Sequence, residues 1–310
     1  GNSWGARGRR DWAAFDQSDS APFFRHALDN GVNFFDTADA YNLGESERII
    51  GETLMGYASR ENIVLSTKVG LRMGDGVNQI GLGRKHLMES IDKQLKRLKT
   101  DYIDLYQIHR LDNITPLEEV LDTLTEIRKA GKILYIGCST MPAYKFAQLL
   151  TLAECKGYAR PIAMQNLYNL IQRDEEREMI PLCVDAGVGL IPYSPLARGV
   201  LAGNRAGGGV GETERAKYDK GLKTGASLFR DSDKEVVATI ISIAKKYDIK
   251  PTQVALSWIL KNPAVVSPII GATKLSHISD AISAVDIELS MDDIKDLERP
   301  YQSRESPLNI

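Results

Sequence analysis

At positions 33–41 the chain reads Asn33-Phe34-Phe35-Asp36-Thr37-Ala38-Asp39-Ala40-Tyr41. The first residues of this stretch are apolar and typical of a short buried strand. A carboxylate, Asp36, ends that strand, and Tyr41 follows five residues later. Functional side chains of parallel α/β proteins gather at the carboxyl ends of strands, because the loops there converge on one ligand. We therefore expect Asp36 to lie at the end of a strand and beside a binding site.

Short apolar runs like this one recur along the chain and alternate with segments of helical period. Runs that are apolar throughout their middle are predicted strands buried on both faces: Asn33–Thr37, Ile63–Val69, Ile103–His109, Ile133–Ser139, Pro161–Leu167, Gly189–Pro195 and Val265–Ala272. The intervening and following segments are predicted helices: Asp19–Asn30, Gly44–Gly56, Arg84–Leu98, Pro116–Ala130, Pro142–Glu154, Arg173–Ala186, Ser232–Tyr247, Thr252–Lys261 and Leu275–Ala284. Glycine follows several of them, as at Gly131 and Gly187, where a helix is expected to end.

Alternating strands and helices imply parallel βαβ units, which suit either a doubly wound sheet or a closed (β/α)8 barrel. No Gly-x-Gly-x-x-Gly follows an early strand, and the regular spacing continues without a linker that would separate two domains. We therefore predict one TIM-barrel domain, a (β/α)8 barrel spanning residues 1–310. The segment before Asp11 holds at most the tail of a strand, so the first strand is expected to be truncated. Residues Ala202–Asp233, which include Gly207-Gly208-Gly209, are expected to form a long loop.

The composition excludes several classes of partner. A formal net charge of −2 gives no electrostatic footprint for nucleic acid or an anionic membrane. No apolar run approaches the roughly 18 residues that a membrane-spanning helix needs. The cysteines Cys138, Cys155 and Cys183 lack the spacing of metal ligands, so no metal site is predicted, and their odd number favours a reducing compartment. The start of the chain does not resemble a signal peptide, and we expect a cytoplasmic protein.

Polar or ionisable residues end six successive predicted strands. They are Asp36, Thr67-Lys68, Gln107-Ile108-His109, Ser139-Thr140, Gln165-Asn166 and Tyr193-Ser194. In a closed barrel these strand ends would surround one pocket.

Four of these side chains form a candidate catalytic group. A lysine on a buried strand is costly unless it is paired, and Asp36 on the neighbouring strand is the natural partner of Lys68. The ammonium would stabilise the phenolate of Tyr41, which could then exchange a proton with a carbonyl or alcohol oxygen that His109 orients. Taken singly, the pair could be a structural ion pair, Tyr41 a packed loop residue and His109 an ordinary barrel-end side chain. Their occurrence at three consecutive strand ends favours the catalytic interpretation.

With these residues in place, the chain resembles the aldo-keto reductases, a family of NADPH-dependent (β/α)8 barrels with an Asp/Tyr/Lys/His tetrad. The resemblance covers essentially residues 20–300 and rests on matching segments: Phe34–Tyr41, Gly44–Glu47, Ser66–Val69, Gln107–Arg110, Tyr135–Ser139, Met164–Asn169 and Tyr193–Gly199. Within the family the chain is most similar to the aryl-alcohol dehydrogenases and the versiconal hemiacetal acetate reductases, and residues Arg173–Met179 resemble that branch.

The resemblance implies a cofactor site. Ser139, Thr140 and Gln165 would hold the nicotinamide carboxamide, Tyr193 would stack on the ring, and the loop after it would take the pyrophosphate. The residues implied in that loop are Ser194, Leu196, Arg198, Gly199 and Leu201. The implied site for the adenosine 2′-phosphate and adenine comprises Gly271, Thr273, Lys274, His277 and Asp280. NADPH/NADP+ is the expected cofactor, with NADH as the alternative.

We therefore predict an enzyme that reduces an aldehyde or ketone with NADPH, with Tyr41 as the general acid. Trp4 would line the substrate pocket together with Tyr41 and His109. The expected partner is a small-molecule carbonyl compound, neither nucleic acid nor membrane, while the sequence specifies neither that compound nor the oligomeric state. Two alternatives remain at this stage: an NADPH-binding partner protein of the same fold, and a Schiff-base aldolase that uses Lys68 as its nucleophile.

Overall fold

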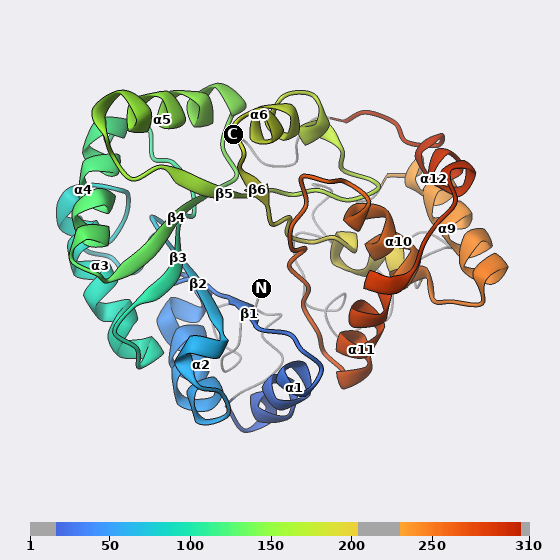
Figure 1. Ribbon diagram of the computed structural model, residues 1–310, viewed down its shortest axis with the longest axis horizontal. Coiled ribbons are helices and arrows are strands. Elements are labelled where there is room, and N and C mark those ends of the chain that lie inside the picture. The colour runs from blue at the N-terminus through green and yellow to red at the C-terminus, as the bar shows by residue number, and fades with distance from the viewer. Residues whose placement is uncertain (1–16, 204–229, 305–310) are drawn as a thin grey trace. The chain divides into compact units, whose positions relative to one another are not determined.

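The computed structural model describes residues 17–203 and 230–304 (Figure 1). Two compact units can be described separately. The first comprises the chain up to Gln165 together with Leu182–Val188, and the second comprises Asn166–Pro181 and the chain from Gly189 onwards. Trp4 and most of the expected loop Ala202–Asp233 lie outside the described residues.

The first unit is built on a parallel sheet. Its strands follow one another in chain order and are β1 (Phe34–Asp36), β2 (Val64–Val69), β3 (Ile103–Ile108), β4 (Ile133–Ser139) and β5 (Pro161–Gln165). The register pairs Asp36 with Ser66, Lys68 with Gln107, and Ser139 with Gln165. Since all these strands run in one direction, their polar carboxyl ends share one edge, as the sequence predicted.

One α-helix connects each pair of neighbouring strands in this sheet. Figure 1 shows these helices along one face of the sheet: α2 (Glu45–Thr53), α3 (Arg84–Leu98), α4 (Leu117–Lys129) and α5 (Ala143–Lys156). Helix α1 (Gln17–Asp29) precedes them, and α6 (Met179–Asp185) follows β5. Gly131 and Gly157, which follow α4 and α5, have φ angles of 74° and 69°, a left-handed conformation that glycine adopts at little cost. The predicted alternation of parallel strands and helices is thus confirmed for this unit.

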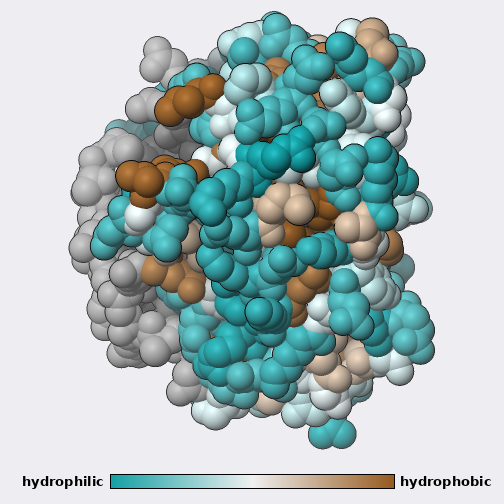
Figure 2. All heavy atoms as spheres, turned by 90° about the vertical axis from the view of Figure 1, so that its left-hand side faces the viewer, coloured by the Kyte–Doolittle hydropathy of each residue, from teal (hydrophilic) through white to brown (hydrophobic). Residues whose placement is uncertain are grey.

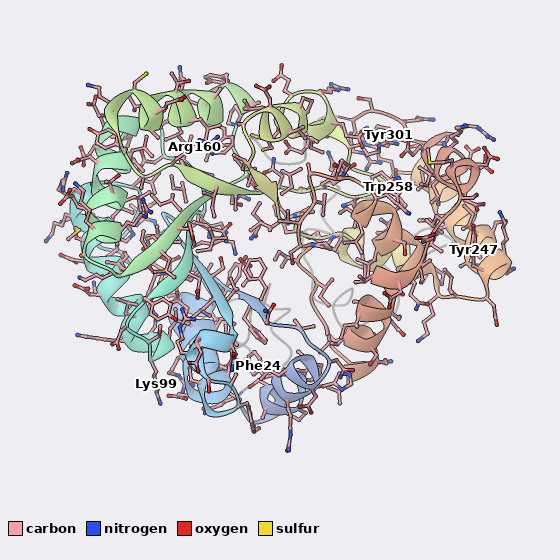
Figure 3. All side chains as sticks on the ribbon, viewed as in Figure 1. Phe24, Lys99, Arg160, Tyr247, Trp258 and Tyr301 are labelled. Carbon is pink, nitrogen blue, oxygen red and sulfur yellow. The ribbon has the colours of Figure 1, made fainter. Side chains whose placement is uncertain are left out.

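The helices are amphipathic and cover an apolar core. Leu87, Ile91 and Leu98 of α3 are fully buried, whereas its lysines point to solvent. Figure 2 views the molecule from the left-hand side of Figure 1 and shows a surface on which hydrophilic side chains dominate. Phe24 projects from α1 (Figure 3), and its ring centroid lies 5.9 Å from that of Phe35 in β1. Burial of these apolar side chains is the main stabilising contribution to the unit.

Within its described residues, the second unit contains one short strand, β6 (Gly189–Leu190), and helices α9 (Asp233–Tyr247), α10 (Pro251–Leu260), α11 (Leu275–Ser283) and α12 (Met291–Glu298). The predicted strand at Val265–Ala272 is present only as parallel bridges from Val265 to Leu190 and from Ile269 to Tyr193. Pro251 occupies the first turn of α10, where the missing N–H costs nothing. Helix α12 was not predicted from the sequence, and its eight residues are capped by Ser290.

Arg173 organises the packing of this second unit. Its guanidinium lies 5.4 Å from the ring centroid of Trp258 and 5.2 Å from that of Tyr301, two residues labelled in Figure 3. It also forms ion pairs with Glu176 at 2.8 Å and Glu298 at 3.3 Å. These contacts tie the segment after β5 to α10 and α12. The predicted helix Arg173–Ala186 is accordingly divided into a short 3-10 turn and α6.

The remaining helical turns are of the 3-10 type: η1 (Tyr41–Gly44), η2 (Leu54–Gly56), η3 (Arg60–Asn62), η4 (Asp174–Glu176), η5 (Ala197–Ala202) and η6 (Ala284–Asp286). Among the helices of the described ranges, none combines the length and apolar character needed to cross a membrane.

Candidate active site

The four predicted catalytic residues come together at the carboxyl ends of β1, β2 and β3. Lys68 Nζ donates a hydrogen bond of 2.6 Å to Asp36 Oδ2, and each side chain is only 1% exposed. The ammonium nitrogen lies 5.2 Å from the ring centroid of Tyr41. The centroid of the His109 ring lies 5.7 Å from that of Tyr41, and the two rings are nearly perpendicular at 83°. The structure therefore joins a buried ion pair, a phenol and an imidazole in one group.

Asp36 is held by several donors besides Lys68. Its Oδ1 accepts hydrogen bonds of 3.0 Å from the amide groups of both Gln107 and Gln165. Lys68 in turn donates to the main-chain oxygen of Thr37 at 2.8 Å. A buried ion pair is tolerated when further hydrogen bonds satisfy its remaining polar atoms, and these contacts do so.

The same contacts set the charge states of the pair. Burial alone would raise the pKa of Asp36, but the charge of Lys68 and hydrogen bonds from Lys68 and Gln165 hold the pKa below its ordinary value. Burial would lower the pKa of Lys68, yet the charge of Asp36 and the interaction with Tyr41 raise it. Both groups are thus ionised near neutral pH. An ammonium held this way is a poor nucleophile, which argues against the Schiff-base alternative.

Asp39 has a different environment from Asp36. Its Oδ1 accepts a hydrogen bond of 2.6 Å from the main-chain N–H of Ala40, and its own N–H donates to the oxygen of Lys68 at 3.2 Å. Burial, followed by the negative charge of Glu47, raises the pKa of Asp39 well above its ordinary value. Asp39 shapes the turn that leads to Tyr41.

Three predicted cofactor ligands lie beside the tetrad in the first unit. Ser139 ends β4 and Gln165 ends β5, opposite each other in the register. Ser139 Oγ accepts a hydrogen bond of 3.2 Å from Arg110 and lies 3.3 Å from the hydroxyl of Thr140. Thr140 has a φ of 43°, so the chain turns sharply directly after the strand. All three side chains are buried, and they bring hydroxyl and amide groups to this edge of the sheet.

The loop after Tyr193 lies in the second unit and has an unusual backbone. Ser194, Arg198 and Gly199 have φ angles of 53°, 54° and 91°. A Cβ added at Gly199 would meet no atom within 4 Å, so space remains beside this residue. Successive backbone N–H groups in a turn can form a concave surface that binds anions. Of the other predicted ligands, Tyr193 and Leu196 are half-buried, while Leu201 is fully buried in the core.

The predicted 2′-phosphate segment leads into α11, also in the second unit. Lys274 is exposed and occupies the N-cap position of this helix. The N–H of Thr273 donates to His277 Nδ1 at 3.3 Å, and Lys250 forms an ion pair of 2.7 Å with Asp280. Gly271 has open space where a Cβ would stand. A lysine beside a helix N-terminus is a suitable anion-binding arrangement.

Two glutamines hold the residues of the tetrad in place. Gln107, expected at a strand end but without a role, donates to Asp36, and Gln94, which was not predicted, donates to the main-chain oxygen of Lys68 at 3.0 Å. A signal for Gln94 was present, because it stands in the apolar stripe of α3 formed by Leu87, Ile91 and Leu98. A polar residue in such a stripe indicates a buried hydrogen-bond partner.

Glu175, in η4 of the second unit, leads to a testable prediction. Burial raises its pKa from an ordinary value of 4.5 to about 7, and the negative charge of Asp174 contributes in the same direction. Because the folded state holds this proton more tightly than the unfolded state, its contribution to stability is lost as pH rises from 4.5 through 7. We expect Glu175→Gln to stabilise the protein by about 1–3 kcal/mol near pH ~8, but hardly near pH ~4.5.

Thermal unfolding of both proteins at the two pH values would measure this difference. Glu178→Gln is a matched control, because Glu178 is a neighbouring but exposed carboxylate. Parallel pH dependences for the wild type and Glu175→Gln would show that Glu175 is not held in its protonated form.

Together, the parallel sheet and the Asp/Lys/Tyr/His group at its carboxyl edge define an α/β protein equipped to move a proton at a strand-end site. The chain belongs to the aldo/keto reductase family, which it matches over residues 4–301. It is 38% identical to the versiconal hemiacetal acetate reductase of Aspergillus parasiticus, over 95% of this chain and 90% of the relative. A Schizosaccharomyces pombe protein with the provisional name aryl-alcohol dehydrogenase is 39% identical over 94% and 87% of the two chains. An aldo-keto reductase of Fusarium vanettenii is 38% identical over 93% and 83%.

These findings confirm the family and the branch predicted from the sequence. The protein is an oxidoreductase that acts on carbonyl or alcohol groups.

Proposed function

We propose that this protein reduces an aldehyde or ketone to the alcohol with NADPH, and that Tyr41 is the general acid. The observation that carries this proposal is the position of Tyr41, whose ring centroid lies 5.2 Å from the Lys68 ammonium and 5.7 Å from the centroid of the His109 ring. We further propose that the chain forms a single-domain (β/α)8 barrel and that the protein is located in the cytoplasm. Family membership and the consecutive parallel strands of the first unit support the barrel.

The residues of the tetrad have separate roles in this reaction. A nicotinamide cofactor, when bound, would supply the hydride for the carbonyl carbon. Tyr41 gives its phenolic proton to the carbonyl oxygen, so that the substrate gains one hydride and one proton. Lys68 stabilises the phenolate that remains, and Asp36 keeps Lys68 charged and in place. His109 donates a hydrogen bond that orients the same oxygen, and solvent then restores the proton of Tyr41.

The residues at the predicted cofactor sites are chemically suited to NADPH. Ser139, Thr140 and Gln165 would bind the nicotinamide carboxamide through hydroxyl and amide groups. The loop with positive φ angles around Gly199 would take the pyrophosphate, since space remains beside that residue. Lys274 at the N-terminus of α11 would bind the 2′-phosphate that distinguishes NADPH from NADH.

The preference for NADPH can be tested at Lys274. We expect Lys274→Ala to weaken NADPH binding about tenfold, since a charge-assisted contact to phosphate contributes roughly 1.5 kcal/mol. NADH binding should hardly change, because NADH lacks the 2′-phosphate. Fluorescence titration with each cofactor measures both constants. Equal losses for the two cofactors would contradict a 2′-phosphate contact.

Turnover is tested by mixing the purified chain with NADPH and a panel of aromatic and aliphatic aldehydes and ketones. Consumption of NADPH together with formation of the alcohol is the expected result. NADPH binding without turnover on any member of a broad panel would instead indicate a protein that holds the cofactor without catalysis.

A further inference from the structure

A buried polar network links α2 and α3 to β2 behind the tetrad. Glu47 Oε1 accepts hydrogen bonds from the hydroxyl of Thr67 at 2.5 Å and from Gln94 Nε2 at 2.9 Å. Glu47 Oε2 accepts from Arg97 at 2.7 Å. Glu47, Gln94 and Thr67 are fully buried. Burial of polar groups costs free energy unless each group is hydrogen-bonded. A fully hydrogen-bonded network beside the strand that carries Lys68 therefore indicates a specific role.

Gln94 is the link between this network and the tetrad. Its Nε2 donates both to Glu47 and to the main-chain oxygen of Lys68, the latter at 3.0 Å. Its Oε1 accepts a hydrogen bond of 2.6 Å from the hydroxyl of Tyr106 in β3. Since the Glu47 carboxylate and the Lys68 carbonyl can only accept, the amide nitrogen must face them, and the orientation of Gln94 is determined.

Tyr106 maintains this orientation of Gln94 because its hydroxyl donates a hydrogen bond to Gln94 Oε1. Its ring and hydroxyl are fully buried, and burial followed by the charges of Asp39 and Glu47 raises its pKa well above the ordinary value. The phenol therefore keeps its proton near neutral pH and donates it in the hydrogen bond to Gln94.

The carbonyl of Lys68 connects the network to the loop that carries Tyr41. The same oxygen that accepts from Gln94 also accepts from the N–H of Asp39, at 3.2 Å. Asp39 lies two residues before Tyr41 in the chain. Displacement of this carbonyl would therefore move both the base of the Lys68 side chain and the turn that precedes Tyr41.

Close helix packing brings Glu47 to this position. A Cβ added at Gly51 of α2 would lie 2.3 Å from the main-chain oxygen of Arg97, and one added at Gly44 would lie 2.6 Å from Arg97 Nε. Real Cβ atoms do not approach backbone so closely, so α2 can approach α3 this closely only because residue 51 is glycine, while a Cβ at position 44 would displace the Arg97 side chain. The Glu47–Arg97 ion pair is thus built into the packing of the two helices.

From these contacts we propose that Gln94 and Glu47 are positioning residues for Lys68. They fix the position of the Lys68 main-chain carbonyl and thereby the position of its ammonium relative to Tyr41. The inference rests on the proposed role of Tyr41 as the proton donor. Misplacement of a catalytic group by about 1 Å can lower a rate roughly 100-fold, so the effect should be seen in kcat.

The test is Gln94→Leu, which removes the hydrogen bonds of the amide but keeps a side chain of similar size. We expect kcat to fall about 10- to 100-fold, whereas KM and the Kd for NADPH stay within about twofold. Binding should be preserved because neither Gln94 nor Glu47 belongs to the proposed substrate or cofactor site.

A conservative variant separates positioning from charge. Glu47→Gln keeps an oxygen that accepts from Thr67 and Gln94, so it should retain most of kcat while losing stability through Arg97. Glu47→Leu should lose kcat as Gln94→Leu does. Thr125→Val is a control for general destabilisation. The buried Thr125 hydroxyl donates a hydrogen bond to the main-chain oxygen of Leu121 and accepts one from the N–H of Ala159, so neither bond involves Lys68. It should lower the melting temperature without changing kcat.

A folded Gln94→Leu protein with the kcat of the wild type would overturn the inference. If Gln94→Leu does not fold, Tyr106→Phe takes its place, since it removes only the hydroxyl that orients Gln94. A severalfold loss of kcat at unchanged KM would then support positioning, and a wild-type kcat would refute it. Failure of the proposed function is distinguishable, because it would leave Tyr41→Phe active.

Discussion

Tyr41→Phe is expected to abolish turnover while the affinity for NADPH remains close to that of the wild type. The substitution removes only the phenolic oxygen, so the ring can keep its edge-to-face contact with His109 and its position beside Lys68. Loss of a positioned general acid typically costs 100- to 10,000-fold in rate. NADPH consumption with an active aldehyde measures the rate, and fluorescence titration measures cofactor binding.

Tyr57→Phe provides the matched control, because Tyr57 belongs to the same unit and is 49% exposed. It should leave both rate and affinity unchanged. A Tyr41→Phe enzyme that keeps wild-type turnover would show that another group delivers the proton, and the proposed mechanism would be wrong.

The tetrad was predictable from the sequence because its members follow directly from local patterns. Each apolar run identifies a strand, and the first polar residues after the run identify its carboxyl end. Asp36, Lys68 and His109 could be placed at one edge of a parallel sheet on that basis. Tyr41 was expected beside them because it follows Asp36 closely in the chain.

The groups that hold the tetrad were harder to predict, because they depend on contacts between distant segments. Gln165 reaches Asp36 across 129 positions and Gln107 reaches it across 71. Nothing in the local sequence of a glutamine at a strand end shows whether its amide faces a cofactor or another side chain. Sheet register and side-chain orientation decide this, and both arise only in the folded chain.

Short elements escaped prediction for a related reason. Helix α12 has eight residues, too few for a helical period to stand out, and it depends on the cap by Ser290 and on its packing in the second unit. The expected strand at Gly189–Pro195 is regular only at Gly189–Leu190. Its remaining residues include Pro192 and Pro195, which lack the N–H that a strand ladder requires.

The second large effect is expected from Lys68→Met, which should lower both stability and turnover. The substitution leaves the Asp36 carboxylate 1% exposed and without its cation, and breaking a buried pair in this way costs about 3–5 kcal/mol. Turnover should fall to the level of Tyr41→Phe or below, because no positive charge remains to stabilise the phenolate. Urea unfolding measures the first effect and NADPH consumption the second.

The double variant Asp36→Asn/Lys68→Met separates these two consequences. Asparagine removes the uncompensated charge but keeps an oxygen that can accept from Gln107 and Gln165, so most of the lost stability should return. Turnover should not return, since the ammonium is still missing. A double variant that regains activity together with stability would mean that Lys68 serves only to neutralise Asp36. Stability recovered without activity would assign Lys68 the electrostatic role in proton transfer from Tyr41.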